Sequence, residues 1–234
     1  MPLVLGALGF FLGPLLHGLA VQSGDDSDLK VAPTCPRCGR DFRWLAWRCE
    51  CGRLRWRELA AALVVGAGFA GFAAVIGVRP VLVAHLWMVA VTAVLIVTDL
   101  DHFRIPNSVL YPGTLGGLIL LTVGAIMEGL SSALVRGLIG GAAYFGFLFV
   151  VFIVARGEGF GFGDVKLAFL LGLFAGFHGF LNLAWALIIT ALLGGVPALL
   201  LLAMGKGRKA AIPYGPPLVL GAWAAILFGS ALIG

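Results

Sequence analysis

The sequence has few charged residues for its length. Only 12% of the 234 residues are Asp, Glu, Lys or Arg, whereas 61% are hydrophobic, and the mean hydropathy is +1.06. A soluble domain of this length could not bury so much apolar surface. The composition therefore excludes a soluble globular protein. It predicts an integral membrane protein that crosses the lipid bilayer several times.

Polar stretches are also few, and they separate long apolar runs. A bilayer core takes about 20 apolar residues per helix. We therefore expect an all-α, polytopic membrane helix bundle with about eight transmembrane helices. The runs lie near residues 2–22, 58–78, 80–98, 108–127, 132–155, 164–179, 181–204 and 213–233. The first run has no basic residues before it, so we expect a membrane helix there and not a signal peptide.

Basic residues are scarce in one of the two sets of connections between these runs. Fourteen of the sixteen Lys and Arg residues fall in the other set or beside it, all except Arg79 and Arg136. The positive-inside rule makes the basic set cytoplasmic, so both termini should face outward. This bias accounts for most of the formal net charge of +5, and we expect no nucleic-acid partner.

Cysteine occurs only four times, always within the cytoplasmic segment 23–57. Cys35 and Cys38 form a C-P-x-C-G turn, and Cys49 and Cys51 form a tighter C-E-C-G pair. Four thiolates make a closed tetrahedral site for structural zinc, so we expect a small zinc-ribbon-like insertion. Two disulfides or four free thiols are the alternatives, and a reducing cytoplasm disfavours disulfides. The chain then divides into a first transmembrane helix (1–22), this zinc-binding segment (23–57) and a membrane domain (58–234).

Acidic residues stand at the ends of two apolar runs on the cytoplasmic side. Asp99 and Asp101 end the third run in "VTDLDHFRIPN", and only one of them should face the bundle interior because residues i and i+2 diverge on a helix. Asp164 opens the sixth run, after a glycine-rich stretch that we expect to leave room for a second peptide. Taken singly, Asp164 could be a helix N-cap, and Asp99 and Asp101 could belong to a solvated loop.

Together, two carboxyl groups at one membrane face can activate a water molecule. One ionised Asp takes a proton from the water, and the other, kept protonated, donates to the scissile peptide. The helix dipole favours an anion at Asp164 and disfavours one at Asp99, so we expect Asp164 to be the base and Asp99 the acid. The spacing in sequence does not show that the two groups meet.

Three motifs resemble the bacterial type IV prepilin peptidases, membrane aspartic proteases of the GxGD class. "GFGFGDVKLAFLLG" is similar to the family's G-x-G-D-x-K segment, with Gly161, Gly163 and Asp164 in register. "TDLDHFRIPN" resembles its first acidic loop, in which the catalytic residue corresponds to Asp99, and "IPYGPPLVLGAW" resembles a late segment. The resemblance covers roughly residues 60–225. It makes Asp99 and Asp164 the expected catalytic pair. The supporting residues expected around them are Gly161, Gly163, Asp101, Pro106 and Lys166.

The resemblance implies a substrate and a location. Such enzymes cut the basic leader from prepilins and pseudopilins at the cytoplasmic face of the bacterial inner membrane. Bifunctional members also methylate the new N-terminus with S-adenosylmethionine, and these carry a four-Cys zinc segment between their first two spans. A peptidase-only enzyme with an architectural zinc module is one alternative. A proton-coupled transporter and a structural subunit without an active site are the others. His17, His85 and His178 show no spacing typical of metal ligands.

Overall fold

The computed structural model describes residues 1–23, 56–157, 161–197 and 213–232, and within them every regular element is helical. The elements follow one another as α1 (Pro2–Ser23), α2 (Trp56–Ile76), α3 (Pro80–His102), α4 (Asn107–Met127), α5 (Ser131–Val154), α6 (Phe162–His178), α7 (Phe180–Thr190), the π-helical turn η1 (Ala191–Gly195) and α9 (Gly215–Leu232). The predicted all-α class is confirmed. The four cysteines of the predicted zinc segment lie outside the described residues.

Helices occupy all eight apolar runs that the sequence predicts as spans. Five of them, α1 to α5, are long and apolar enough to cross a membrane. Helix α6 has 17 residues, and the segments Phe180–Gly195 and Gly215–Gly229 are shorter apolar helices. The structure therefore supports a polytopic membrane protein. The seventh run differs from the single continuous span expected over 181–204, because a π-helical turn follows α7 at Ala191.

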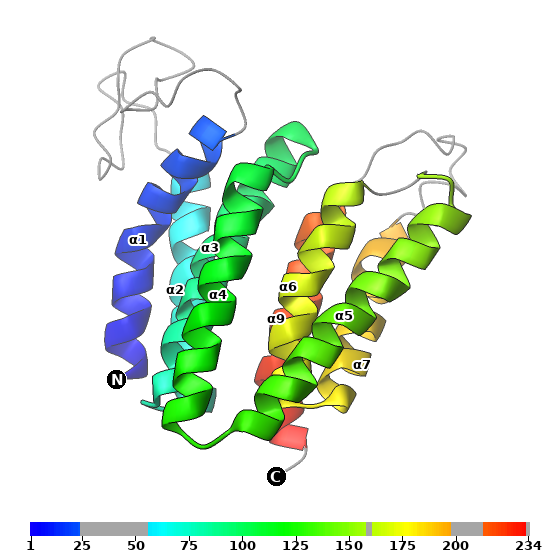
Figure 1. Cartoon of the computed structure of the whole chain (residues 1–234). Coiled ribbons are helices and arrows are strands. Elements are labelled where there is room, and N and C mark those ends of the chain that lie inside the picture. Colours follow the sequence, from blue (N-terminus) through cyan, green and yellow to red (C-terminus); the bar gives the residue numbers. More distant parts are fainter. Residues whose placement is uncertain (24–55, 158–160, 198–212, 233–234) are drawn as a thin grey trace, which may run out of the picture.

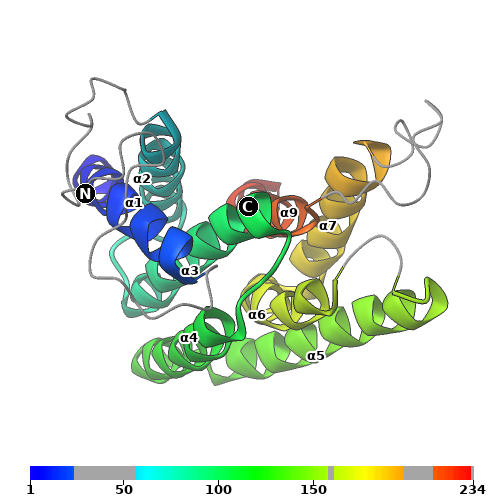
Figure 2. The ribbon, with the colours of Figure 1, turned by 90° about the horizontal axis from the view of Figure 1, so that it is seen from above.

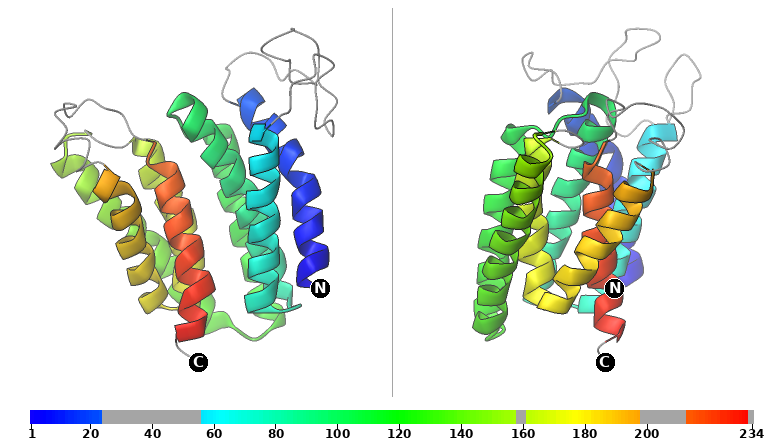
Figure 3. Two further views of the ribbon diagram at one scale, coloured as in Figure 1. Left: turned by 180° about the vertical axis from the view of Figure 1, so that it is seen from behind. Right: turned by 90° about the vertical axis from the view of Figure 1, so that its right-hand side faces the viewer.

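The helices form two groups that meet along the centre of the bundle (Figures 1 and 2). Helices α1, α2, α3 and α4 make the first half, and helices α5, α6, α7 and α9 make the second. The halves join where α3 contacts α9 and where α4 contacts α5 and α6. The view from behind shows the same division (Figure 3, left). Helix α1 begins and α9 ends at the same end of the bundle, as the expected even number of spans requires.

Small residues allow the helices of the second half to approach closely. A Cβ atom added to Gly172 of α6 would lie 2.6 Å from the carbonyl oxygen of Gly140 in α5. One added to Gly140 would lie 2.8 Å from the Cα of Gly176. Backbones pack this closely in membranes because lipid offers no hydrophobic drive, so van der Waals contact must hold the helices together. Helix α6 is thereby held between α5 and the centre of the bundle, with its middle fully buried.

Candidate active site

The end of α3 places Asp99 inside the bundle. Its side chain is only 4% exposed, although it lies in the last turn of the helix. The backbone N–H of Gly215, the first residue of α9, donates a hydrogen bond of 2.8 Å to Asp99 Oδ2. Helix α3 stops soon afterwards because Phe103 takes the left-handed conformation, with φ 52°, and its N–H donates to the Asp99 carbonyl. Burial of a carboxylate is energetically unfavourable, and the hydrogen bond from the Gly215 N–H offsets part of that cost for Asp99.

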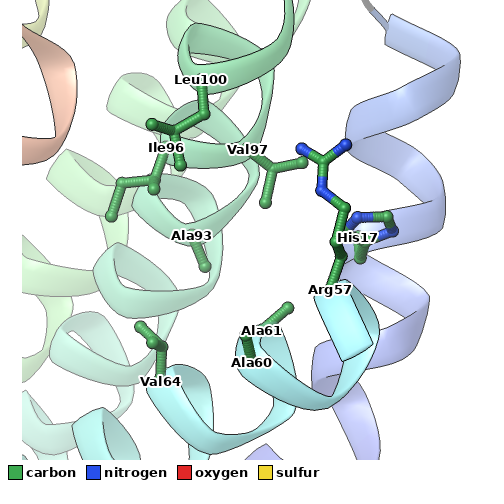
Figure 4. A pocket seen from close by; sticks show the side chains of 9 residues that line it. All are labelled: His17, Arg57, Ala60, Ala61, Val64, Ala93, Ile96, Val97 and Leu100. Atoms are coloured by element: carbon green, nitrogen blue, oxygen red, sulfur yellow. The ribbon is translucent and has the colours of Figure 1, made fainter. Parts of the chain in front are cut away.

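Asp101, two residues further along α3, points away from Asp99's surroundings. It forms an ion pair with Arg57 at the start of α2. The prediction that only one of these two acids faces the interior is therefore confirmed. Arg57 also lines a cavity of about 400 Å³ between α1, α2 and α3 (Figure 4). Apart from Arg57 and His17 its walls are apolar, and neither Asp99 nor Asp164 reaches it.

The start of α6 holds Asp164 in the first helical turn, at 5% exposure. Its Oδ2 accepts a hydrogen bond of 2.9 Å from the N–H of Gly161, and its own N–H donates to the Gly161 carbonyl. The N-cap residue is Gly161 and Asp164 is the third residue of the helix, so the interpretation of Asp164 as the N-cap is wrong; its carboxyl group instead accepts the N–H of the N-cap residue from within the first turn. Its other oxygen, Oδ1, is buried and finds no hydrogen-bond partner among the described residues. That oxygen is the acceptor that the site leaves available.

The two aspartates lie at the same end of the bundle, Asp99 in the last turn of α3 and Asp164 in the first turn of α6. Gly163, next to Asp164, packs against Ile105 in the connection that follows α3, which brings the two acidic segments together. Asp99 also lies at the N-terminus of α9, because it accepts the N–H of Gly215. Both carboxyl groups therefore sit at the positive end of a helix dipole. The helix dipoles therefore do not decide which of Asp99 and Asp164 is the acid and which is the base, contrary to the expectation from the sequence.

Gly163 explains why the loop before α4 lies against α6. A Cβ atom there would lie 2.9 Å from the Cβ of Ile105. Ile105 precedes Pro106, whose carbonyl accepts the first backbone hydrogen bonds of α4 from Val109 and Leu110. The expectation that the glycines leave space for a second peptide is wrong at Gly163, because a residue of the same chain fills that space. The glycine instead lets the two acidic segments pack together.

Lys166 is bound to α4. Its Nζ donates a hydrogen bond of 3.0 Å to Asn107 Oδ1 and lies over the rings of Tyr111 and Phe162. These contacts direct the side chain across the interface between α6 and α4. It therefore fastens the start of α6 to the start of α4.

Two residues of the site were not singled out from sequence, although the motif "IPYGPP" contains both. Gly215 donates to Asp99, and its missing side chain makes room, since a Cβ atom there would lie 2.8 Å from Asp99 Oδ2. Tyr214 directly precedes Gly215, the donor to Asp99. Its ring packs against Gly194 of η1. The sequence feature that could have identified both residues is the Tyr-Gly pair directly before the last apolar run.

Within the part of the chain that the structure describes, no group of three or more His, Cys, Asp or Glu side chains could hold a metal ion.

Fold and site together define a class: a helical membrane protein that carries two buried aspartates, from segments far apart in the sequence, at one end of its bundle. The model of the type IV leader peptidase family matches residues 86–204, just over half of the chain, and the chain belongs to this family. It is accordingly an aspartic peptidase of the membrane. The matched region contains Asp99 and Asp164.

Relatives along most of the chain carry the same name, "Prepilin leader peptidase/N-methyltransferase". The protein from Stutzerimonas stutzeri is 28% identical, over 97% of this chain and 89% of its own length. Those from Aeromonas hydrophila and Bacillus subtilis are 26% and 28% identical, over 96% and 87% of this chain and over 88% and 85% of their own. No solved structure matches the chain.

Proposed function

We propose that this protein removes the basic leader peptide from type IV prepilins or pseudopilins, with Asp99 and Asp164 as the catalytic pair. The observation that supports the proposal is that two buried aspartates, one from α3 and one from α6, lie at the same end of the bundle. Each is oriented by a backbone N–H on Oδ2, from Gly215 and from Gly161. Family membership supplies the substrate class.

The proposed reaction is hydrolysis by an activated water. The ionised member of the pair takes a proton from water while the water oxygen bonds to the scissile carbonyl carbon. The protonated member then gives its proton to the leaving amine as the C–N bond breaks. Two adjacent carboxyl groups suit this division because like charges so close together disfavour double ionisation. The pair shares its protons, so we assign the roles to the dyad and not to either residue.

The proposed site lies at the cytoplasmic face of the bacterial inner membrane. Among the described residues, Arg57, Arg104 and Arg156 lie at helix ends on the side of the aspartates, which supports this orientation. A transporter would place its acids near the bilayer midplane, whereas Asp99 and Asp164 lie at helix ends. The position of the acids thus favours the peptidase.

Cleavage of a co-expressed prepilin tests the proposal. We expect Asp99→Asn and Asp164→Asn to accumulate in the membrane at the wild-type level and to leave the precursor uncut, a loss of at least about 10³-fold. Asp101→Asn is the matched control, since its ion pair with Arg57 is partly exposed and such pairs contribute about 1 kcal/mol or less. If either catalytic variant still cuts at the wild-type rate, the dyad is wrong.

A zinc module and a methylation step complete the proposal. Cys35, Cys38, Cys49 and Cys51 are the proposed zinc ligands, on the chemistry of four thiolates in a reducing compartment. S-adenosylmethionine is the proposed methyl donor, because the relatives' names include N-methyltransferase. The mass of the mature product decides methylation, and metal analysis of the purified chain decides zinc. A peptidase without the methyl step would yield an unmodified N-terminus.

A further inference from the structure

A buried histidine, His85, and a partly buried one, His178, join α3 and α6 at the end of the bundle opposite the aspartates. His85 lies near the start of α3 and is fully buried, and His178 is the last residue of α6. Their Nε2 atoms are 2.9 Å apart, which is a hydrogen bond between imidazoles. The rings also stand edge to face, with centroids 5.0 Å apart. This contact has no part in the peptidase chemistry proposed above.

The protons of the pair can be assigned from its neighbours. His85 Nδ1 is 2.8 Å from the carbonyl oxygen of Val81, which can only accept, so Nδ1 carries the hydrogen. In a neutral ring the Nε2 of His85 is then bare and accepts. His178 must therefore donate from its Nε2. The bond has a fixed direction and requires a donor at position 178.

The pair belongs to a polar network that anchors it in the fold. Glu128, at the end of α4, accepts the N–H of Val81 at 2.9 Å and pairs with Arg79. On the other side, Arg136 of α5 lies 3.5 Å from the carbonyl oxygen of Phe177, next to His178. The network thus runs from the α4 end through the first turn of α3 to the last turn of α6. Its ends lie in different halves of the molecule.

Aromatic side chains fill the space around His85. The rings of Phe72 on α2 and of Phe174 and Phe177 on α6 lie 5.6, 5.1 and 6.4 Å from it. Phe72 in turn meets Trp223 of α9 at 6.1 Å. A hydrogen bond in such apolar surroundings is strengthened by the low dielectric, and losing one partner leaves a buried unpaired nitrogen. The bond is therefore positioned to fix how the halves meet.

We propose that His85 and His178 act as a positioning pair, which holds α3 and α6 at one end so that Asp99 and Asp164 meet correctly at the other. The two aspartates are carried by the same two helices, so a change in the angle between the helices changes the separation of the carboxyl groups. This inference rests on the proposed two-aspartate function. A misplacement of about 1 Å at a reacting group can cost about 10²-fold in rate.

Steady-state cleavage by a matched series of variants tests the pair. His178→Leu removes the donor, and we expect kcat to fall at least about tenfold with KM within about twofold, because docking of the substrate is untouched. His178→Gln restores an N–H donor, and we expect its kcat within about threefold of wild type. Thr92→Val is the control: Thr92 is buried on α3, the helix that carries His85, and among the described residues its hydroxyl bonds to the carbonyls of Met88 and Val89 of its own helix.

A distance measurement gives a readout that does not depend on catalysis. Spin labels would be attached through ketone-bearing amino acids at Leu63 of α2 and Val150 of α5, which are exposed and lie in opposite halves. Thiol labels are avoided because the chain has four cysteines of its own. We expect a shifted or broadened distance distribution in His178→Leu and a distribution like that of wild type in His178→Gln.

The outcomes are decisive in either direction. Wild-type kcat in His178→Leu, or a His178→Gln variant as slow as His178→Leu, overturns the positioning role. An unchanged distance distribution in His178→Leu also overturns it. If instead Asp99→Asn and Asp164→Asn still cut the substrate, the proposed dyad fails, while the distance measurement still decides whether the histidines hold the halves together.

Discussion

At the scale of single residues, the site depends as much on missing side chains as on present ones. Gly215 and Gly161 supply the backbone N–H groups that hold the two aspartates, and Gly163 admits Ile105. A carboxyl group buried near lipid is tolerated only with such partners. Gly163 and Gly215 are therefore explained by close approach to Ile105 and Asp99.

Gly215→Ala is expected to impair catalysis through Asp99. The new Cβ atom would lie 2.8 Å from Asp99 Oδ2, so the carboxyl group or the start of α9 must move. We expect kcat for prepilin cleavage to fall at least about tenfold, because the reacting group is misplaced.

Gly71→Ala serves as the matched control for Gly215→Ala. Its Cβ atom would meet the side chain of Leu227 at 3.4 Å, an ordinary contact between α2 and α9. Its kcat should equal that of wild type. A Gly215→Ala enzyme with normal kcat would show that the hydrogen bond from α9 to Asp99 is not needed.

At the scale of elements, α6 is the helix around which the site is built. Its first turn carries Asp164, its last turn carries His178, and its middle packs on α5 through glycines. It is also among the shorter helices, with 17 residues. A short helix held from three sides can place its ends reproducibly, which is what a two-residue site at a helix end requires.

Gly172→Ala should destabilise the α5–α6 contact. The added Cβ atom would lie 2.6 Å from the Gly140 carbonyl oxygen and 2.7 Å from the Cβ of Tyr144. Overpacking of this kind costs about 1–3 kcal/mol of unfolding free energy, which thermal unfolding in detergent would detect. Gly146→Ala on α5, where a Cβ atom meets nothing within 4 Å, should unfold like wild type. Equal unfolding of the two variants would mean that α5 can move away without loss.

At the scale of the whole molecule, the site lies where two helical halves meet. Asp99 comes from the first half, and Asp164 and Gly215 come from the second, so neither half contains a complete site. Helix α1 begins, and helix α9 ends, at the end of the bundle opposite the aspartates (Figure 1). Any motion between the halves would therefore act directly on the carboxyl groups.

Reporter fusions test the orientation of the whole molecule. We expect alkaline phosphatase fused after the last residue to be active, because that end should lie outside the cytoplasm. The same enzyme fused after Gly157, in the connection before α6, should be inactive. The reverse pattern would place the aspartates on the outer face and would contradict cleavage of a cytoplasmic leader.

The sequence by itself determined the membrane class and the approximate positions of the helices, because hydropathy is a local property, and its short motifs singled out Asp99 and Asp164, the pair that we propose as catalytic. Tertiary structure decided what lies between distant segments. Only packing brings Gly215 to Asp99, fills the space at Gly163 with Ile105 and joins His85 to His178. These contacts connect residues far apart in the chain, and their partners are backbone groups and single side chains that leave no periodic pattern in the sequence.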